Sequence, residues 1–139
     1  MATIKLEVVS PDQLVYTADI NMLIVRSTGG ELGILPHHAP LVTGLVSHAM
    51  RVKTEDREEL IAVSGGFMEV QPEKITVLAT AAELPINIDI NRAKEAYARA
   101  QERLDRFHKE TPPGVDVDWK RAQAALDRAK ARLQATKQL

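Results

Sequence analysis

The chain has 139 residues, of which 45% are hydrophobic, 4% aromatic and 27% charged, with a formal net charge of −1 and no cysteine. This length suits one compact domain or a small domain with an appendage, and the apolar content is sufficient for a packed core. The composition excludes disulfides and cysteine-bound metals, and the near-zero net charge argues against a nucleic-acid binder. No apolar run approaches the roughly 20 residues of a membrane helix, and the first residues lack the apolar core of a signal peptide. We expect a soluble protein without direct membrane insertion that stays in the compartment where it is made.

The two parts of the chain carry opposite charge. Residues 1–90 contain 6 Lys and Arg against 12 Asp and Glu, whereas residues 91–139 contain 12 against 7. This asymmetry predicts two modules with different electrostatic roles.

The first part of the chain alternates apolar and polar residues with the period of a β strand. In the stretch TIKLEVVS, the side chains of Ile4, Leu6 and Val8 fall on one face, with Lys5 and Glu7 on the other. Short strands separated by frequent turn signals predict an antiparallel β sandwich or barrel. Further β-rich runs cover residues 20–27, 50–54, 59–64, 67–70 and 74–80.

Two glycine pairs interrupt this pattern. The pair Gly65–Gly66 lies in SGGF, which is followed by a strand and lacks the Lys and Ser/Thr of a phosphate-binding loop. We therefore predict a tight β turn there, and we interpret Gly29–Gly30 in the same way. Glycine pairs in β-rich segments also often mark bulges or positive φ angles.

The periodicity changes near Pro85, which is predicted to end the last strand. Asp89 is a predicted helix N-cap, because its carboxylate can accept hydrogen bonds from backbone amides two or three residues further on. The stretch ETPPGVD interrupts the helix, since proline and glycine break helices, and Asp116 or Asp118 would cap a second helix. Apolar residues recur at steps of three and four along two stripes, which are Ile90, Ala93, Tyr97, Ala100, Leu104 and Phe107, and then Trp119, Ala122, Leu126, Ala129, Leu133 and Thr136.

The predicted fold is α+β with two domains. An antiparallel β sandwich or barrel covers residues 1–84, a linker covers 85–90, and an antiparallel two-helix hairpin covers 91–139. Alanine at several seam positions favours helix formation but buries little apolar area. We infer helices that are weakly held to each other and to the β module, so that the hairpin can open and repack elsewhere. A permanently docked pair of helices is the alternative.

The stretch GGELGILPHHAPL, residues 29–41, contains an acidic residue, two adjacent histidines and two prolines. Its adjacent histidines, His37 and His38, would point to opposite faces of a strand, so one metal ion would rarely bind both. No nucleophile motif accompanies them. We expect no metal site and no catalytic residue here, and we interpret the stretch as a loop shaped by Pro36 and Pro40.

Arginines gather on one face of each predicted helix. Some arginines have a glutamate four residues earlier, at the spacing of helical ion pairs, namely Arg99 with Glu95 and Arg106 with Glu102. Facing rows of arginine on two helices would form a cationic cleft that suits phosphate, because guanidinium binds phosphate bidentately. An ordinary solvated face is the alternative. The rows are Arg92, Arg99 and Arg103 on the first helix, and Arg121, Arg128 and Arg132 on the second.

In combination, these features resemble the epsilon subunit of bacterial F-type ATP synthase. GELGILPHHAPL and AVSGGFMEV carry the likeness in the β part, and DVDWKRAQAALDRAKARL resembles the second helix of epsilon subunits from some bacilli. IDINRA resembles their I/L-D-x-x-R-A nucleotide-binding motif. The likeness implies a non-catalytic rotor subunit in the central stalk of a proton-translocating enzyme, peripheral to the cytoplasmic side of the bacterial membrane. Such a subunit couples rotation of the c-ring to the catalytic head.

The resemblance also implies protein partners. The sandwich would bind the gamma subunit and the c-ring through a partner-contact loop that contains Glu31, His37 and His38, with Glu31 facing the polar loops of the ring. The hairpin would lie on the sandwich in one state. In another state it would extend along gamma into the head, where its arginines would meet the acidic lever of the catalytic beta subunits and restrain ATP hydrolysis.

A regulatory ATP site follows from the same resemblance. ATP and the beta lever would compete for the same arginines, so ATP would favour the folded hairpin. No residue of the predicted site requires Mg²⁺. Residues 97–114 do not align with the bacillar pattern, so Arg99 and Arg103 are left out of the predicted site. One side would be formed by Glu83 and Asp89 as polar contacts, Ile88 and Ala93 against the base, and Arg92, with Arg128 and Arg132 opposite.

Two other functions are open at this point. The chain could be a stand-alone nucleotide-sensing or ligand-binding module without a rotary partner. It could also be a nucleic-acid binder that uses the basic hairpin, although the acidic sandwich and the shortage of aromatic residues disfavour this.

Overall fold

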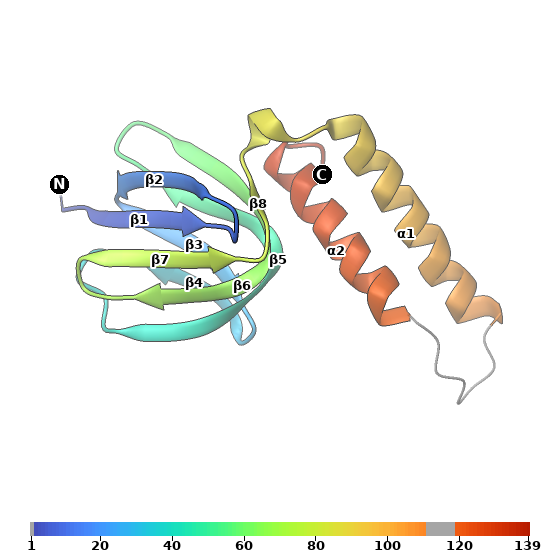
Figure 1. The fold of residues 1–139 in the computed structure, drawn as a ribbon, viewed down its shortest axis with the longest axis horizontal. Coiled ribbons are helices and arrows are strands. Elements are labelled where there is room, and N and C mark those ends of the chain that lie inside the picture. Colours follow the sequence, from blue (N-terminus) through green and yellow to red (C-terminus); the bar gives the residue numbers. More distant parts are fainter. Residues whose placement is uncertain (1, 111–118) are drawn as a thin grey trace.

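The computed structural model describes residues 2–110 and 119–139. Figure 1 shows a β module beside a pair of helices, joined by a short 3-10 turn. Neither described helix is long and apolar enough to cross a bilayer. The strands are β1 (Ile4–Val9), β2 (Leu14–Ile20), β3 (Met22–Ser27), β4 (Gly30–Ile34), β5 (Leu41–Lys53), β6 (Glu58–Val70), β7 (Lys74–Ala79) and β8 (Ala82–Glu83), followed by η1 (Pro85–Asn87), α1 (Ile90–Glu110) and α2 (Trp119–Ala135).

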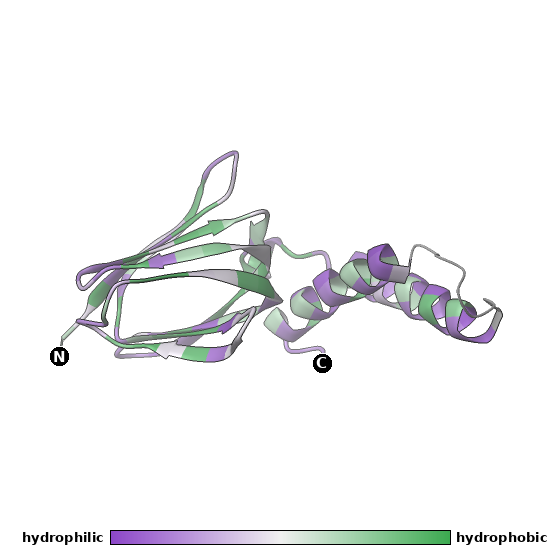
Figure 2. Ribbon diagram, turned by 90° about the horizontal axis from the view of Figure 1, so that it is seen from below, coloured by the Kyte–Doolittle hydropathy of each residue, from purple (hydrophilic) through white to green (hydrophobic). Residues whose placement is uncertain are grey.

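The strands form a sheet in the order β2-β1-β7-β6-β5-β3-β4, with β8 paired to β6. Figure 2 shows this sheet curving into two layers that enclose the core, which confirms the predicted sandwich. The pairing is antiparallel except between β1 and β7, which run parallel. Aliphatic side chains fill the interior, and Leu6, Ile61 and Met68 are each 0% exposed. All the buried residues of this core cluster lie in β1–β7.

Strand β6 continues through Gly65 and Gly66, so the tight turn predicted there is wrong. Both glycines have positive φ, +79° and +126°, which agrees with the alternative expectation of a bulge. A Cβ on Gly66 would lie 2.2 Å from the carbonyl oxygen of Leu78, so the close approach of β7 requires glycine. The other pair behaves as predicted, because Thr28 and Gly29 form the turn between β3 and β4.

Four stretches form strands that the sequence patterns did not indicate, namely β2, β4, the first part of β5, and the two-residue β8. Strand β4 lies inside the segment predicted to be a loop, so the loop is confined to residues 35–40. The reason is alternation, since Leu32 and Ile34 point toward the core while Glu31 and Gly33 are exposed.

Helix α1 begins as predicted. The backbone N–H of Arg92 donates to Asp89 Oδ1 over 3.1 Å, which confirms Asp89 as its N-cap. The predicted caps Asp116 and Asp118 and the Pro-Pro-Gly turn lie outside the described residues. Figure 1 shows the two helices side by side and antiparallel. Three residues of each predicted stripe are buried, whereas Trp119 at the start of the second stripe is 45% exposed. The buried residues are Ala93, Ala100 and Leu104, and then Ala122, Ala129 and Leu133.

Helix α2 packs against α1 on one side and against β5 and β6 on the other. Its carboxyl end turns back sharply at Lys137, whose φ is +60°. There Gln138 N donates to Leu133 O over 2.7 Å and Lys137 N donates to Gln134 O over 3.0 Å, the two bonds of a Schellman cap. The contact between helices and sheet has few large side chains. It consists of Ala62, Ile88, Ala93, Leu133 and Ala135, with Ala49, Leu60 and Tyr97 at its margin.

Candidate functional site

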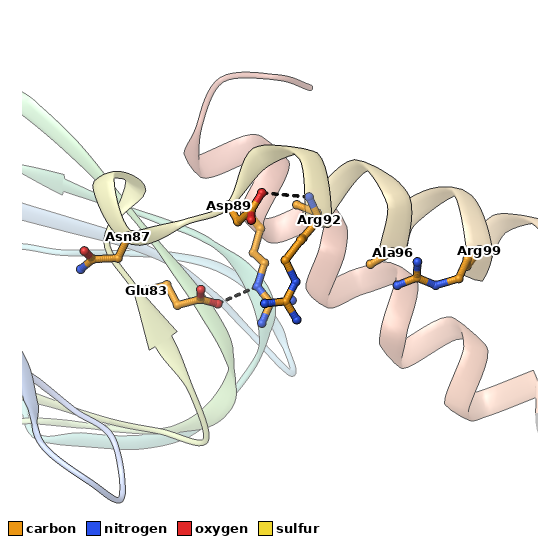
Figure 3. A pocket seen from close by; sticks show the side chains of 8 residues that line it. Glu83, Asn87, Asp89, Arg92, Ala96 and Arg99 are labelled. Carbon is orange, nitrogen blue, oxygen red and sulfur yellow. Dashed lines mark hydrogen bonds and ion pairs between the residues drawn. The ribbon is translucent and has the colours of Figure 1, made fainter.

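A polar cavity of about 340 Å³ lies where the sandwich, the linker and both helices meet. Glu83 ends β8 at the edge of the cavity, Arg92 and Arg99 project from α1 about two turns apart, and Arg132 reaches in from α2. Figure 3 shows Glu83 and Arg92 directed toward one another near the start of α1, with Arg99 further along the helix. Eight residues line the cavity, namely Glu83, Asn87, Asp89, Arg92, Ala93, Ala96, Arg99 and Arg132.

Glu83 and Arg132 form an ion pair across the cavity. Arg132 Nε donates to Glu83 Oε1 over 2.6 Å, and the two side chains are 33% and 30% exposed. The residues are 49 positions apart in the chain, so the pair joins the end of the sandwich to the second helix. Because water screens a partly exposed pair of this kind, we expect its contribution to stability to be small.

The cavity carries an excess of positive charge. Three arginines face two carboxylates, and the first turn of α1 contains no acidic residue. The amino end of a helix adds a partial positive charge. Guanidinium groups in this arrangement suit a multiply charged phosphate ligand through charge-assisted, bidentate hydrogen bonds. Among the described residues, no group of three or more His, Asp or Glu could hold a metal ion.

Five of the seven predicted nucleotide-site residues line this cavity, namely Glu83, Asp89, Arg92, Ala93 and Arg132. The other two do not. Ile88 is 8% exposed and packs in the apolar contact between helices and sheet, while the side chain of Arg128 is exposed on α2 and outside the lining.

Three lining residues, Asn87, Ala96 and Arg99, are absent from the predicted nucleotide site. The spacing places Arg99 in the same arginine row as Arg92, but the poor alignment of residues 97–114 left it out of the site. Among the described residues Arg99 makes no ion pair with Glu95, whereas the predicted pair of Glu102 and Arg106 is present at 2.7 Å.

The predicted partner-contact residues do not form one loop. Glu31 lies in β4 near the turn to β3, and it is opposite Arg26 of β3 in the strand ladder. His37 follows the other end of β4, has a φ of +65°, and donates its backbone N–H to Pro72 O over 3.1 Å. His38 Nδ1 lies 2.7 Å from Ala39 O. The sandwich therefore presents Glu31 and the histidine pair at opposite ends of one strand.

Comparisons with known proteins agree with this two-module arrangement. The family model described as "ATP synthase, Delta/Epsilon chain, beta-sandwich domain" matches residues 3–85, and the model described as "ATP synthase, Delta/Epsilon chain, long alpha-helix domain" matches residues 87–137. Both modules, in this order, are those of a delta or epsilon chain.

Curated relatives narrow the assignment. The chain is 47% identical over 133 residues to the ATP synthase epsilon chain of Halalkalibacterium halodurans, covering 96% of each chain. It is 50% identical to that of Bacillus licheniformis, covering 96% of this chain and 97% of the relative. The chain therefore belongs to the ATP synthase epsilon chain family, whose members are non-catalytic subunits of the complex.

Solved structures share the fold. A chain in the Euglena gracilis mitochondrial ATP synthase superposes with a TM-score of 0.77 at 21% identity, covering 99% of this chain and 82% of that one. A chain in the central stalk and c-ring of the Tetrahymena thermophila enzyme gives 0.59 at 12% identity, covering 97% of both.

Proposed function

We propose that the chain is a rotor subunit in the central stalk of a bacterial proton-translocating ATP synthase, peripheral to the cytoplasmic side of the membrane. Its sandwich binds the gamma subunit and the c-ring, and its hairpin restrains ATP hydrolysis by reaching toward the catalytic beta subunits. ATP acts as a regulatory ligand that holds the hairpin on the sandwich. The full-length likeness to epsilon chains supports the first part, and the cavity supports the last.

Exposed apolar side chains on the outer face of the sandwich are evidence for a protein partner. Cross-strand neighbours Leu14, Val9, Leu78 and Phe67 form a row across β2, β1, β7 and β6. Leu14 and Leu78 are each 53% exposed and Phe67 is 61% exposed, and Val42 on β5 adds a side chain that is 69% exposed. A contiguous exposed apolar row marks an interaction surface, and we assign it to gamma.

The helix–sheet contact supports a movable hairpin. Its central side chains include Ala62, Ala93 and Ala135, which have little apolar surface to bury. Burial of apolar surface contributes roughly 25 cal/mol per Å². Because these side chains bury little surface, we infer that the free energy of docking the hairpin on the sandwich is small. A partner that offers comparable burial can therefore compete with the sandwich for the hairpin.

The regulatory proposal rests on which parts of the chain supply the side chains that line the cavity. Glu83 comes from the sandwich, Arg92 and Arg99 from α1, and Arg132 from α2. These side chains surround one volume only when the hairpin is folded on the sandwich. A ligand that binds this state alone shifts the equilibrium toward it.

Titration of the isolated chain with ATP by calorimetry tests the site. Arg92→Ala and Arg132→Ala should weaken binding by roughly tenfold or more each, since each removes a charge-assisted contact. Arg106→Ala is the matched control, because Arg106 lies on α1 but pairs with Glu102 away from the cavity. Binding should persist without Mg²⁺. An absence of heat with the wild-type chain would remove the nucleotide site.

The proposed role as an inhibitory rotor subunit is tested by truncation. Truncation after residue 84 should leave a sandwich that still assembles with the complex, while ATP hydrolysis by membranes rises. Unchanged hydrolysis would contradict the inhibitory role. Affinity purification from membranes separates this function from a stand-alone sensor, because recovery of alpha, beta, gamma and c subunits is expected only for the rotor subunit.

A further inference from the structure

The β3–β4 hairpin is attached to the rest of the sheet along one seam. In the strand order β4 is at the edge, and β3 pairs on its other side with β5. That ladder is interrupted. It pairs Ile24 with Arg51 and then Ser27 with Leu45, with a shift of register between them. The backbone of β5 therefore bulges away from β3 in the middle of the seam.

The imidazole of His48 fills this gap. Its Nε2 accepts the backbone N–H of Arg26 over 3.0 Å, and its Nδ1 lies 2.7 Å from the carbonyl oxygen of Val46. Because an amide N–H can only donate, Nε2 must be the unprotonated nitrogen and Nδ1 carries the hydrogen. The side chain is 7% exposed. A neutral histidine thus replaces a missing backbone hydrogen bond between two strands.

Charged groups surround His48 from several elements. Arg26 of β3, Glu31 of β4 and Arg51 of its own strand line the same small cavity, together with Gln134 of α2. Arg51 forms an ion pair with Glu58 of β6, with 2.8 Å between Arg51 Nε and Glu58 Oε1. Burial lowers the pKa of His48, with a smaller lowering from Arg26, while the Val46 carbonyl and Glu31 oppose this shift.

We propose that His48 is an acid-sensitive link that holds the β3–β4 hairpin, and with it Glu31, against the sheet. Protonation places a second N–H on the ring, so that Nε2 faces the Arg26 amide with a donor opposite a donor. The hydrogen bond is lost, and the middle of the seam opens. His48 is a positioning residue, since it acts on Glu31 through the backbone of β3.

The direction of the effect follows from proton linkage. A histidine whose folded pKa is lowered leaves stability fully present above its ordinary pKa of about 6.5. As the pH falls below that value, His48 binds a proton in the unfolded state but remains neutral in the folded state. The unfolding constant then rises by up to about tenfold per pH unit until the folded pKa is passed.

Amide hydrogen exchange with NMR detection tests the link in the full-length chain. The protection of the Arg26 amide, corrected for intrinsic exchange rates, should be constant above about pH 6.5 and should fall in the window below that value. In His48→Gln the side-chain carbonyl can accept the Arg26 N–H but does not titrate, so the protection should become independent of pH in this window. His38→Gln, in the exposed loop, is the matched control and should keep the wild-type dependence.

Nitrogen chemical shifts of the His48 ring give a second, independent measurement on the unmodified chain. The proposal requires the Nδ1–H tautomer at neutral pH and a loss of Arg26 protection that follows ring protonation. An Nε2–H tautomer would overturn it. So would an Arg26 amide that stays protected while the ring is protonated, or a His48→Gln variant with the wild-type pH dependence. If that variant does not fold, the ring and amide measurements on the wild type decide.

Discussion

The sandwich and the hairpin are held in place by different kinds of side chain. Leu6 and Ile61 at the centre of the sandwich are large and fully buried. The corresponding residues of the helical seam, Ala122 and Ala129, are equally buried but small. Because burial free energy scales with area, the sandwich is stable by itself, whereas the position of the hairpin is sensitive to changes of a few kilocalories. An anchor and a movable arm can thus coexist in one short chain.

A cavity in the sandwich core should have the largest effect on stability. Leu6→Ala should lower the free energy of unfolding by about 2–5 kcal/mol, because the rigid surroundings only partly collapse. Urea unfolding of the full chain measures this. Leu78→Ala is the matched control, since Leu78 is 53% exposed and should change stability by less than about 0.5 kcal/mol. Equal losses in both variants would mean that the sandwich is not the rigid anchor.

Overpacking the helical seam should come next. Ala129→Leu inserts a larger side chain where two helices approach closely, which should destabilise the closed hairpin by about 1–3 kcal/mol. Spin-label distances between the helices and thermal melting report the change. Ala124→Leu on the exposed face of α2 should leave both unchanged. An unchanged distance in Ala129→Leu would show that the seam is loose rather than tightly packed.

Local signals were sufficient to predict the helices. The steps of three and four gave both stripes, and the carboxylate of Asp89 gave the first boundary. The strands were harder, because their limits depend on neighbours far along the chain. Gly66 illustrates this: Leu78 of β7 approaches so closely that a Cβ at this position would collide with its carbonyl oxygen, so sequence alone favoured a turn where the strand continues.

The candidate site was predictable to the extent that it is local. Glu83, Asp89 and Arg92 come from one short segment, and the motif resemblance placed them together. The facing arginine rows placed Arg132 in the same cleft as Arg92, but its meeting with Glu83 came only through the resemblance, since nothing in the spacing fixes how far α2 extends before it reaches Glu83. Asn87 gave no signal, because it lines the cavity through the 3-10 turn that precedes α1.

Removal of the cap tests the boundary between anchor and arm. Asp89→Ala should lower stability by about 1 kcal/mol, because the Arg92 amide loses its acceptor. Asp89→Asn keeps an acceptor at the same place and should retain most of that stability. Circular dichroism and urea unfolding distinguish the two variants. If Asn behaved like Ala, the charge of Asp89 rather than its capping bond would be the important property.

The ion pair between Glu83 and Arg132 should have the smallest effect, although it joins the two modules directly. A double-mutant cycle with Glu83→Gln and Arg132→Gln should give a coupling free energy of about 0.2–1 kcal/mol, and raising the salt concentration should reduce it, because both partners are partly exposed. Glu102 and Arg106 form the matched control pair, since both lie on α1. Only the first cycle should change the fraction of hairpins that are docked. A coupling well above 1 kcal/mol that is insensitive to salt would mean that this pair fastens the arm, and the contrast between a firm anchor and a readily displaced arm would then fail.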